Sequence, residues 1–275
     1  MENRIPFYKM HGGGNDFVLI DHRECFIPEA EQPEFVRRVC HRQLGAGADG
    51  LILIEDTPNA NFRWRFYNAD GSEPEMCGNG GRCAARFAVL NGIAPAELAF
   101  ETLAGTIKAE VKGRQVKLLM SGIGDVRLDQ TIPLETATLR GHFMRVGVPH
   151  VAVPVADLEA SPVTQWGRAV RFHPLFAPSG TNVNFIQVEG PHDLRIRTYE
   201  RGVEDETLAC GTGAVASALL SARLGQVQSP VTVHTRGGEA LIIYFTPQGE
   251  TFSEVFLEGD ALVAYQGELW VDELK

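Results

Sequence analysis

Short apolar runs separated by turn residues predict β-strands along most of the chain. Residues 62–67 alternate apolar and polar side chains with a period of two, which is typical of a half-buried strand. The other apolar runs in the first half are short and are separated by turns. We expect strands at 17–20, 51–54, 98–102, 107–111 and 116–120, with 98–102 and 107–111 joined as a hairpin around Ala104-Gly105 and a helix at about 33–44.

An alanine-rich stretch in each half predicts a helix that starts directly after a cysteine. The first follows Cys77-Gly78-Asn79-Gly80 and should end near Leu90, where Asn91-Gly92 supplies a C-terminal cap. The second follows Cys210-Gly211-Thr212-Gly213 and should end near Leu224. Strands are expected around it at 143–148, 184–188, 194–199, 231–235 and 240–245.

The matching cysteines indicate an internal duplication, because 210 − 77 gives an offset of 133 that other residues share. Without gaps, this offset places Glu73 on Glu206, Phe66 on Tyr199 and Asn68 opposite Arg201. A repeat of this length is a duplicated domain and not a solenoid unit, whose periods are about 20–50 residues. We therefore predict an α/β (α+β) fold of two pseudo-symmetric domains, each a mixed sheet around a central helix. The predicted domains are 1–122 with a returning strand at 262–275, and 123–261.

Charge and composition narrow the classes of partner. The 275-residue chain has a formal net charge of −10 and no Lys/Arg-rich block, so we expect neither nucleic acid nor an anionic membrane surface as a partner. No apolar run is long enough to span a bilayer and no leader is evident, which predicts a cytoplasmic protein. Five cysteines without a close C-x-x-C pair argue against a disulfide framework and a structural zinc site.

The two Cys-Gly-x-Gly segments are candidate acid–base groups. A thiolate, not a thiol, abstracts protons, and the N-terminus of a helix lowers the pKa of a thiol through its free N–H groups and dipole. The same N–H groups can bind an anionic group such as a carboxylate. Each segment therefore predicts a base beside an anion-binding site. For Cys83, Cys25 and Cys40 the expected state is a buried, inert thiol.

The motifs resemble those of the diaminopimelate epimerase family. The resemblance rests on Asn68-Ala-Asp-Gly-Ser followed by Cys77-Gly78-Asn79-Gly80, on His11-Gly-Gly-Gly-Asn15-Asp-Phe, and on Tyr199-Glu200-Arg201-Gly202 leading to Cys210. It runs from about residue 7 to the C-terminus. It implies two pseudo-symmetric α/β domains with the active site in the cleft between them. It also implies interconversion of LL- and meso-2,6-diaminopimelate without pyridoxal phosphate or a metal, in a homodimer.

The resemblance also assigns roles to individual residues. Cys77 and Cys210 would be the proton-transferring pair, with Cys77 the base in the LL-to-meso direction. The backbone amides of Gly78-Asn79 and Gly211-Thr212 would contact the reacting carboxylate, and Asn15 and Glu200 would contact the reacting amino group. Asn68, Asn182 and Arg201 would bind the distal L-centre. His150 and Glu200 would tune the second thiol.

Several of these residues have an ordinary structural alternative. Asn15 and Asn68 could serve turns, Glu200 and Arg201 could form a solvated pair, and His150 could be a hydrogen-bonded loop histidine. Two departures from the family pattern affect the residues around the distal contacts. Val148 stands where many members have asparagine, and the segment from Gly202 to Thr207 is one residue longer than the common form.

The sequence argues against other functions. Gly45-Ala-Gly47-Ala-Asp-Gly50 matches the dinucleotide-binding pattern, but that motif needs a strand before it and a helix after it, and here the expected order is reversed. A proline racemase or hydroxyproline epimerase of the same fold would lack the Asn-x-Asp-Gly-Ser element. A binding protein without turnover would have no need for both thiols.

Overall fold

The computed structural model describes residues 4–273, which fold as two compact units. Unit 1 takes in the chain up to Leu118 and again from Gly259, and unit 2 is Leu119–Glu258. The chain passes from one unit to the other within β7 and again within β16. The domain boundaries predicted from the sequence, at residues 122 and 261, remain a prediction.

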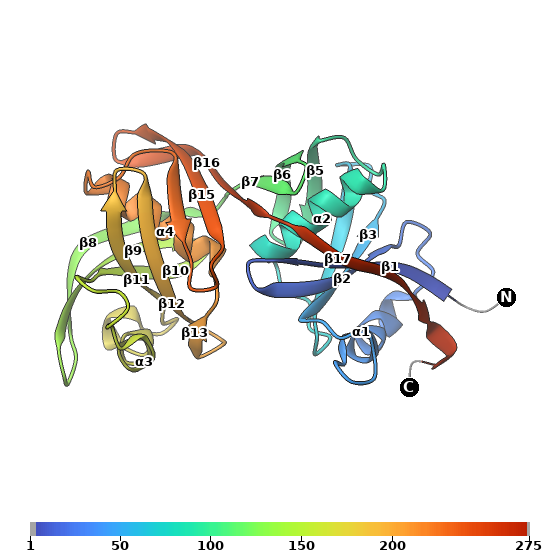
Figure 1. The fold of residues 1–275 in the computed structure, drawn as a ribbon, viewed down its shortest axis with the longest axis horizontal. Coiled ribbons are helices and arrows are strands. Elements are labelled where there is room, and N and C mark those ends of the chain that lie inside the picture. Colours follow the sequence, from blue (N-terminus) through green and yellow to red (C-terminus); the bar gives the residue numbers. More distant parts are fainter. Residues whose placement is uncertain (1–3, 274–275) are drawn as a thin grey trace. The chain divides into compact units, whose positions relative to one another are not determined.

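Unit 1 is a mixed sheet with one helix on each face (Figure 1). In spatial order its strands are β17 (Leu262–Trp270), β1 (Arg4–Gly12), β2 (Asn15–Asp21), β3 (Gly50–Glu55), β4 (Phe62–Asn68), β5 (Glu97–Thr102), β6 (Gly105–Lys112) and β7 (Gln115–Leu119). The pairs β2–β3 and β4–β5 are parallel and the others antiparallel. Its helices are α1 (Gln32–Cys40) and α2 (Gly78–Leu90), with short 3₁₀ turns at Glu29–Glu31 and Val271–Glu273.

Unit 2 repeats this order of neighbours. Its strands are β8 (Ile123–Pro133), β9 (Thr138–Val146), β10 (Val148–Pro154), β11 (Asn182–Gly190), β12 (Asp193–Glu200), β14 (Val231–His234), β15 (Ala240–Gln248) and β16 (Thr251–Asp260), with β13 (Asp205–Thr207) added beside β12. Again only the third and fifth pairs, β10–β11 and β12–β14, are parallel. The helices are α3 (Val163–Arg171), α4 (Gly211–Arg223) and the 3₁₀ turn Pro174–Phe176.

In unit 1 the position that corresponds to β8 is occupied by β17, which comes from the C-terminal part of the chain. β8 pairs antiparallel with β9 at the edge of its sheet, and β17 pairs antiparallel with β1 in the same way. Each sheet therefore has the same pairing pattern, although unit 1 takes its edge strand from about 250 residues further along the chain. The duplication predicted from the sequence is confirmed at the level of topology.

The central helix of each unit packs on one face of its sheet because alternate residues of the strands point to opposite faces. In unit 1, Leu19 and Ile52 belong to the core under α2, whereas their neighbours Val18 and Leu51 belong to the core that includes residues of α1. In unit 2 the core under α4 contains Ala152 and Ile186, and the core with α3 contains Val151 and Phe185. The mostly continuous apolar runs reflect burial on both faces.

The gap-free offset is wrong within the central strands. In unit 1 one row of paired residues is Leu19–Ile52–Phe66, and the corresponding row in unit 2 is Ala152–Asn184–Thr198. Here 152 − 19 is 133, but 184 − 52 and 198 − 66 are both 132. The connection between β10 and β11 is one residue shorter than that between β2 and β3, and the longer segment before Cys210 restores the offset.

The slip changes two residue matches predicted from the sequence. Phe66 corresponds to Thr198 and not to Tyr199, and Asn68 corresponds to Glu200 and not to Arg201. A shift of one residue moves every side chain of a strand to the other face, so the difference decides which side chains lie under each central helix.

Most predicted elements are present, but some were missed. The helix expected at 33–44 ends at Cys40, and β1, β8, β10, β13, β16 and α3 were not predicted. The Gly45–Gly50 segment is preceded by α1 and followed by β3, which confirms the rejection of a dinucleotide-binding motif. Within residues 4–273 we find no helix with both the length and the apolar character needed to cross a bilayer.

Candidate functional site

Cys77 is the N-cap of α2. Its backbone is extended (φ −144°, ψ 115°), and its Sγ accepts a hydrogen bond of 3.4 Å from the amide of Gly80. The thiol is half-buried, and it packs against the core under α2. An acceptor at this position uses one of the amides that a helix leaves unsatisfied in its first turn, and this interaction favours a negatively charged sulfur.

Cys210 occupies the same position at the start of α4. Its backbone is also extended (φ −129°, ψ 107°), and its Sγ lies 3.7 Å from the hydroxyl of Thr212. The residue is buried, with 8% of its surface exposed. α2 and α4 are each 13 residues long, so the sequence correctly predicted a thiol at the start of two matched helices.

The glycines of the two motifs differ in what surrounds them. A Cβ at Gly213 would lie 2.3 Å from Oδ1 of Asn184 and 3.2 Å from Sγ of Cys210, so no side chain fits there without a shift. A Cβ at Gly80 would lie 3.3 Å from Cδ1 of Ile52, a tight but adjustable contact. Around Gly78 nothing lies within 4 Å of that position, which leaves the start of α2 open to a ligand.

The sheet beneath each helix start shows the main difference between the units. Ile52 and Asn184 hold the same place in the strand rows, and each approaches the last glycine of its Cys-Gly-x-Gly motif. Phe66 in unit 1 corresponds to Thr198 in unit 2. We call Ile52 and Phe66 the apolar floor, and Asn184 and Thr198, together with His150 of the adjoining row, the polar floor.

Two of the residues assigned by resemblance, Asn15 and Asn79, lie in direct contact in unit 1. Nδ2 of Asn79 donates to Oδ1 of Asn15 at 2.9 Å, and Nδ2 of Asn15 donates to Asp49 at 3.1 Å. The buried guanidinium of Arg82 donates to Oδ1 of Asn79 at 3.1 Å. These bonds fix which way both amides point and leave one N–H of Asn15 for another acceptor.

Asn68 closes the turn at the end of β4. Its backbone amide donates to the carbonyl of Ser72 at 2.9 Å, and its Nδ2 donates to Oγ of Ser72 at 3.0 Å. Asp70 accepts from the same serine. The structural alternative weighed for Asn68 therefore holds, and it is compatible with a second contact through the remaining N–H.

Asn182 and Arg201 are brought together in unit 2. Oδ1 of Asn182 accepts from the backbone amide of Arg201 at 2.8 Å, while Nδ2 of Asn182 donates to the carbonyl of Pro149 at 3.1 Å. The guanidinium of Arg201 donates to the carbonyl of Ser179 at 3.1 Å. Asn182 thus ties the end of β12 to the start of β10, where Val148 lies exposed.

His150 and Glu200 are both shifted toward the neutral form. Burial, with the charge of Arg201 as a second cause, lowers the pKa of His150 from 6.5 to about 3. Burial likewise raises the pKa of the Glu200 carboxyl, against a hydrogen bond of 3.0 Å from Thr207 that lowers it. Within residues 4–273 no ion pair joins Glu200 to Arg201, so the solvated-pair alternative does not describe this glutamate.

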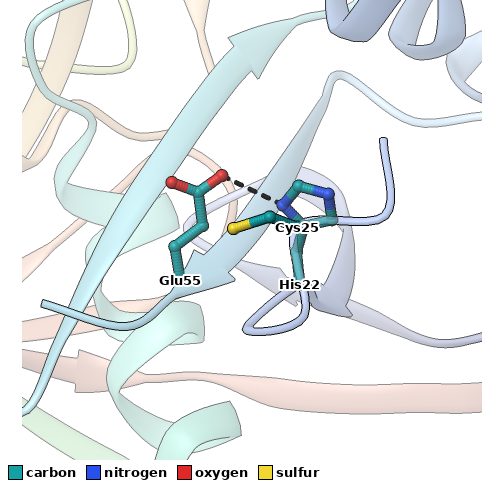
Figure 2. A group of neighbouring side chains, drawn as sticks. All are labelled: His22, Cys25 and Glu55. Carbon is teal, nitrogen blue, oxygen red and sulfur yellow. Dashed lines mark hydrogen bonds and ion pairs between the residues drawn. The ribbon is translucent and has the colours of Figure 1, made fainter. Parts of the chain in front are cut away.

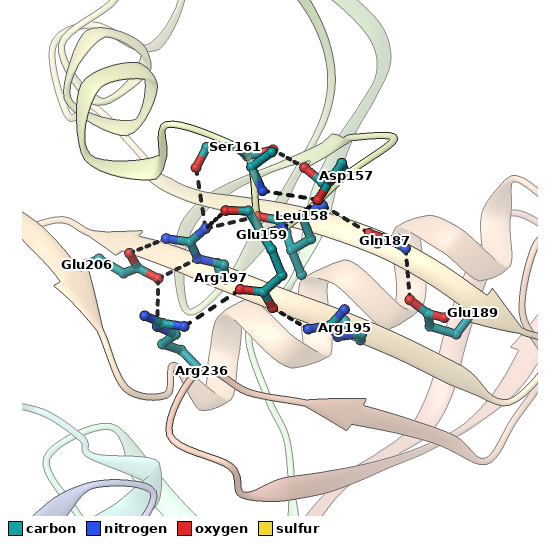
Figure 3. A network of polar contacts seen from close by, with 11 residues as sticks. Asp157, Leu158, Glu159, Ser161, Gln187, Glu189, Arg195, Arg197, Glu206 and Arg236 are labelled. Atoms are coloured by element: carbon teal, nitrogen blue, oxygen red, sulfur yellow. Dashed lines mark hydrogen bonds and ion pairs between the residues drawn. The ribbon is translucent and has the colours of Figure 1, made fainter.

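An arginine network holds the longer segment that precedes Cys210. Arg197 pairs with both oxygens of Glu206 at 2.7 Å and also donates to the carbonyls of Leu158, Glu159 and Ser161 (Figure 3). At the other end of the segment, Glu204 has a positive φ of 60° and accepts from Arg171 of α3 at 3.1 Å. These contacts accommodate the extra residue without disturbing the start of α4.

A group of possible metal ligands in unit 1 is explained by hydrogen bonds. His22, Cys25 and Glu55 lie close together (Figure 2), but both ring nitrogens of His22 are engaged. Nε2 accepts from the amide of Ile27 at 2.9 Å, so the proton is on Nδ1, which faces Glu55 at 3.0 Å. A metal on Nδ1 would break this arrangement. Cys25 is exposed, which contradicts the buried state expected for it, whereas Cys40 and Cys83 are buried as predicted.

A family model described as diaminopimelate epimerase matches the chain over residues 7–128 and 142–263. A diaminopimelate epimerase of Aquifex aeolicus is 49% identical over 96% of this chain and 98% of the relative. A relative of the same description from Archaeoglobus fulgidus is 42% identical over 99% of both chains.

Solved structures with the same fold are much less similar in sequence. A phenazine biosynthesis protein of the PhzF family from Bacillus anthracis superposes with a TM-score of 0.75 at 16% identity, covering 97% of this chain and 99% of the other. A probable proline racemase from Agrobacterium radiobacter gives 0.68 at 16% identity, covering 96% and 92%. At this identity the likeness establishes the fold and no more.

Proposed function

The chain belongs to the diaminopimelate epimerase family, and we propose that Cys77 and Cys210 perform the epimerisation as a pair of acid–base groups on opposite faces of one α-carbon. The activity itself, an isomerase reaction on diaminopimelate, is shared by full-length relatives at 42–49% identity. The observation that carries the proposal is the placement of both thiols as N-caps of matched helices in two duplicated units.

In the LL-to-meso direction, the Cys77 thiolate would take the α-proton and the Cys210 thiol would deliver one to the opposite face. The bond from the α-carbon to hydrogen breaks as an S–H bond forms on Cys77, and the reverse occurs at Cys210. The reaction leaves Cys77 as a thiol and Cys210 as a thiolate, so the next turnover in the same direction requires their protons to exchange with solvent.

The remaining roles follow from the same proposal. Negative charge on the reacting carboxylate would be met by backbone amides at the starts of α2 and α4, namely those of Gly78, Asn79, Gly211 and Thr212. The open space at Gly78 supports this assignment. Asn15 and Glu200 would contact the reacting amino group, and Asn68, Asn182 and Arg201 the distal L-centre. Arg201 suits a carboxylate because its guanidinium is planar and permanently charged.

A homodimer in the cytoplasm completes the proposal, with diaminopimelate as the substrate and units 1 and 2 as the two functional domains. Sedimentation of purified protein at several concentrations tests the dimer. A single species with the mass of one 30.1 kDa chain would contradict it.

The substrate is tested by incubating purified protein separately with LL-diaminopimelate and with L-proline, without added cofactor. We expect meso-diaminopimelate from the first and no D-proline from the second. Racemisation of proline without conversion of LL-diaminopimelate would instead support the activity named for the structural neighbour from Agrobacterium radiobacter.

A further inference from the structure

Asn184 lies between a buried histidine and the turn that carries Cys210. Its side chain is fully buried in β11, and its Oδ1 and the Sγ of Cys210 are both within 3.2 Å of the point where a Cβ on Gly213 would stand. On its other side, Nδ2 lies 3.3 Å from Nδ1 of His150. The parallel pairing of β10 with β11 brings these residues together from positions 34 apart in the chain.

Two neighbours fix the orientation of the Asn184 amide. A backbone carbonyl only accepts hydrogen bonds, so the atom 3.3 Å from the carbonyl of Val151 must be the amide nitrogen. The hydroxyl of Thr198 donates to the opposite atom, Oδ1, at 3.0 Å. Turning the amide over would place two acceptors against each other at Val151. Nδ2 therefore faces His150.

The orientation of Asn184 determines the tautomer of His150. An amide nitrogen only donates, so Nδ1 of His150 must be an unprotonated acceptor. The low pKa of the buried ring keeps it neutral, and its single proton is then on Nε2. Nε2 is itself buried, and within residues 4–273 no acceptor lies at hydrogen-bonding distance from it.

We infer that Asn184 is a positioning residue that holds His150 as the Nε2–H tautomer, so that this histidine donates a hydrogen bond to an anion and does not act as a base. A buried donor without a partner is destabilising, and an acceptor that reaches it during the reaction would remove that cost. The anion is a sulfur or carboxylate that develops negative charge during the reaction. Nε2 has no lone pair with which to accept a proton from a thiol.

This inference deepens the proposed function, because the identity of the anion as the Cys210 thiolate or the substrate carboxylate rests on that proposal. The tautomer does not rest on it. It can be measured without substrate, so an incorrect tautomer and an inactive pair of thiols would be distinct results.

The direct test is a two-bond ¹H–¹⁵N NMR correlation spectrum of histidine-labelled protein, recorded between pH 5 and pH 9. His150 should show an unprotonated Nδ1 and a protonated Nε2 at every pH. His22 is the internal control, because its bonds to Ile27 and Glu55 require the opposite tautomer. A protonated Nδ1 on His150, or titration of His150 within this range, would overturn the inference.

In the Asn184→Asp variant, the group that faces Nδ1 of His150 becomes a hydrogen-bond acceptor instead of a donor. A carboxylate accepts from Nδ1, so His150 should change to the Nδ1–H tautomer and its pKa should rise. We expect kcat to fall by about tenfold or more with KM changed much less, because the donor is misplaced and not the substrate. Asn91→Asp, at the C-cap of α2, is the matched control and should leave both nitrogens of His150 unchanged. An unaltered His150 spectrum in folded Asn184→Asp would contradict the positioning role.

Discussion

The two thiols stand on the same backbone framework but above different floors. Under the start of α2 the sheet presents Ile52 and Phe66, and under the start of α4 it presents Asn184 and Thr198, with His150 beside them. The pairing of strands, the length of the helices and the conformation of the capping cysteines are matched. Duplication has therefore preserved the position of each thiol while the polarity beneath it has diverged.

The proposed reaction with two acid–base groups accounts for the different polarity beneath the two thiols. At the start of a turnover one sulfur must be charged and the other protonated, and in identical surroundings neither thiol would be favoured as the charged one. Above the apolar floor the amide of Gly80 donates to Sγ of Cys77, whereas the polar floor brings the amide group of Asn184 close to the turn that carries Cys210. The two thiols therefore have matched positions on their helices and differ in the sheet residues that lie beneath them.

The largest expected effect comes from removing either thiol. Cys77→Ala and Cys210→Ala should each lower the rate of epimerisation by at least about 10³-fold, because one proton transfer loses its acid–base group. Initial rates with LL-diaminopimelate measure this loss. The control is Cys83→Ala, which shortens a buried side chain of α2 and should retain activity. If either Cys77→Ala or Cys210→Ala kept an activity comparable to that of the unmodified protein, that thiol would not be required for proton transfer.

Substituting the last glycine of each motif tests the floors themselves. Gly213→Ala should destabilise the protein by about 1–3 kcal/mol, because its Cβ would meet the buried Asn184 amide at 2.3 Å. In Gly80→Ala the contact with Ile52 is 3.3 Å, and the gain in helix propensity of about 1 kcal/mol offsets it. Thermal unfolding of the two variants decides the point. Equal losses would mean that the floors are equally tight.

Opposite pH dependence is expected from one carboxylate in each unit. Burial tends to raise the pKa of Asp16, but hydrogen bonds from Arg42 and Lys9 outweigh it and lower the pKa from 3.8 to about 2. This carboxylate stabilises the fold above pH 3.8, and its contribution is lost as the pH falls through about 2. Asp16→Asn should therefore cost on the order of 2 kcal/mol at pH 7 and little near pH 2. Urea unfolding at both pH values measures the change.

Glu200 should behave in the reverse sense, because its pKa is raised in the folded protein. Its stabilising contribution is complete below the unfolded pKa of 4.5 and is lost as the pH rises through the folded value. Relative to the unmodified protein, Glu200→Gln should therefore be more stable at pH 7 than at pH 4. The same variant showing its greatest advantage at pH 4 would show that burial does not govern this carboxyl.

The smallest effect concerns the arginines that hold the segment before each thiol. Arg197 binds Glu206 through two nitrogens at 2.7 Å, whereas Arg65 approaches Glu73 at 3.6 Å. Lysine cannot reproduce a two-pronged pair, so Arg197→Lys should cost about 1–2 kcal/mol and Arg65→Lys less. Denaturation midpoints compare the two. A larger loss at Arg65 would reverse the expected order.

Much of this architecture follows from short-range signals. The Cys-Gly-x-Gly motifs fixed the starts of α2 and α4, and Asn91-Gly92 marked the end of α2. The strand register was less accessible, because apolar side chains on both faces of β3 and β4 conceal a shift of one residue. Asn184 was missed because its partner His150 reaches it only through the pairing of β10 with β11. Arg82 was missed because a buried arginine inside a helix gives no local signal.

The central claim is that one thiol removes the α-proton and the other supplies its replacement. Its most direct test is the isotope content of both diastereomers early in the reaction of LL-diaminopimelate in D₂O. The Cys210 thiol exchanges its hydrogen with D₂O, whereas the Cys77 thiolate can return only the single proton it has removed. The first meso product should therefore contain deuterium at the inverted centre while the remaining LL substrate stays protiated. Early meso product that keeps the original protium would show that a single base returns the proton it removed, and would contradict the two-thiol account.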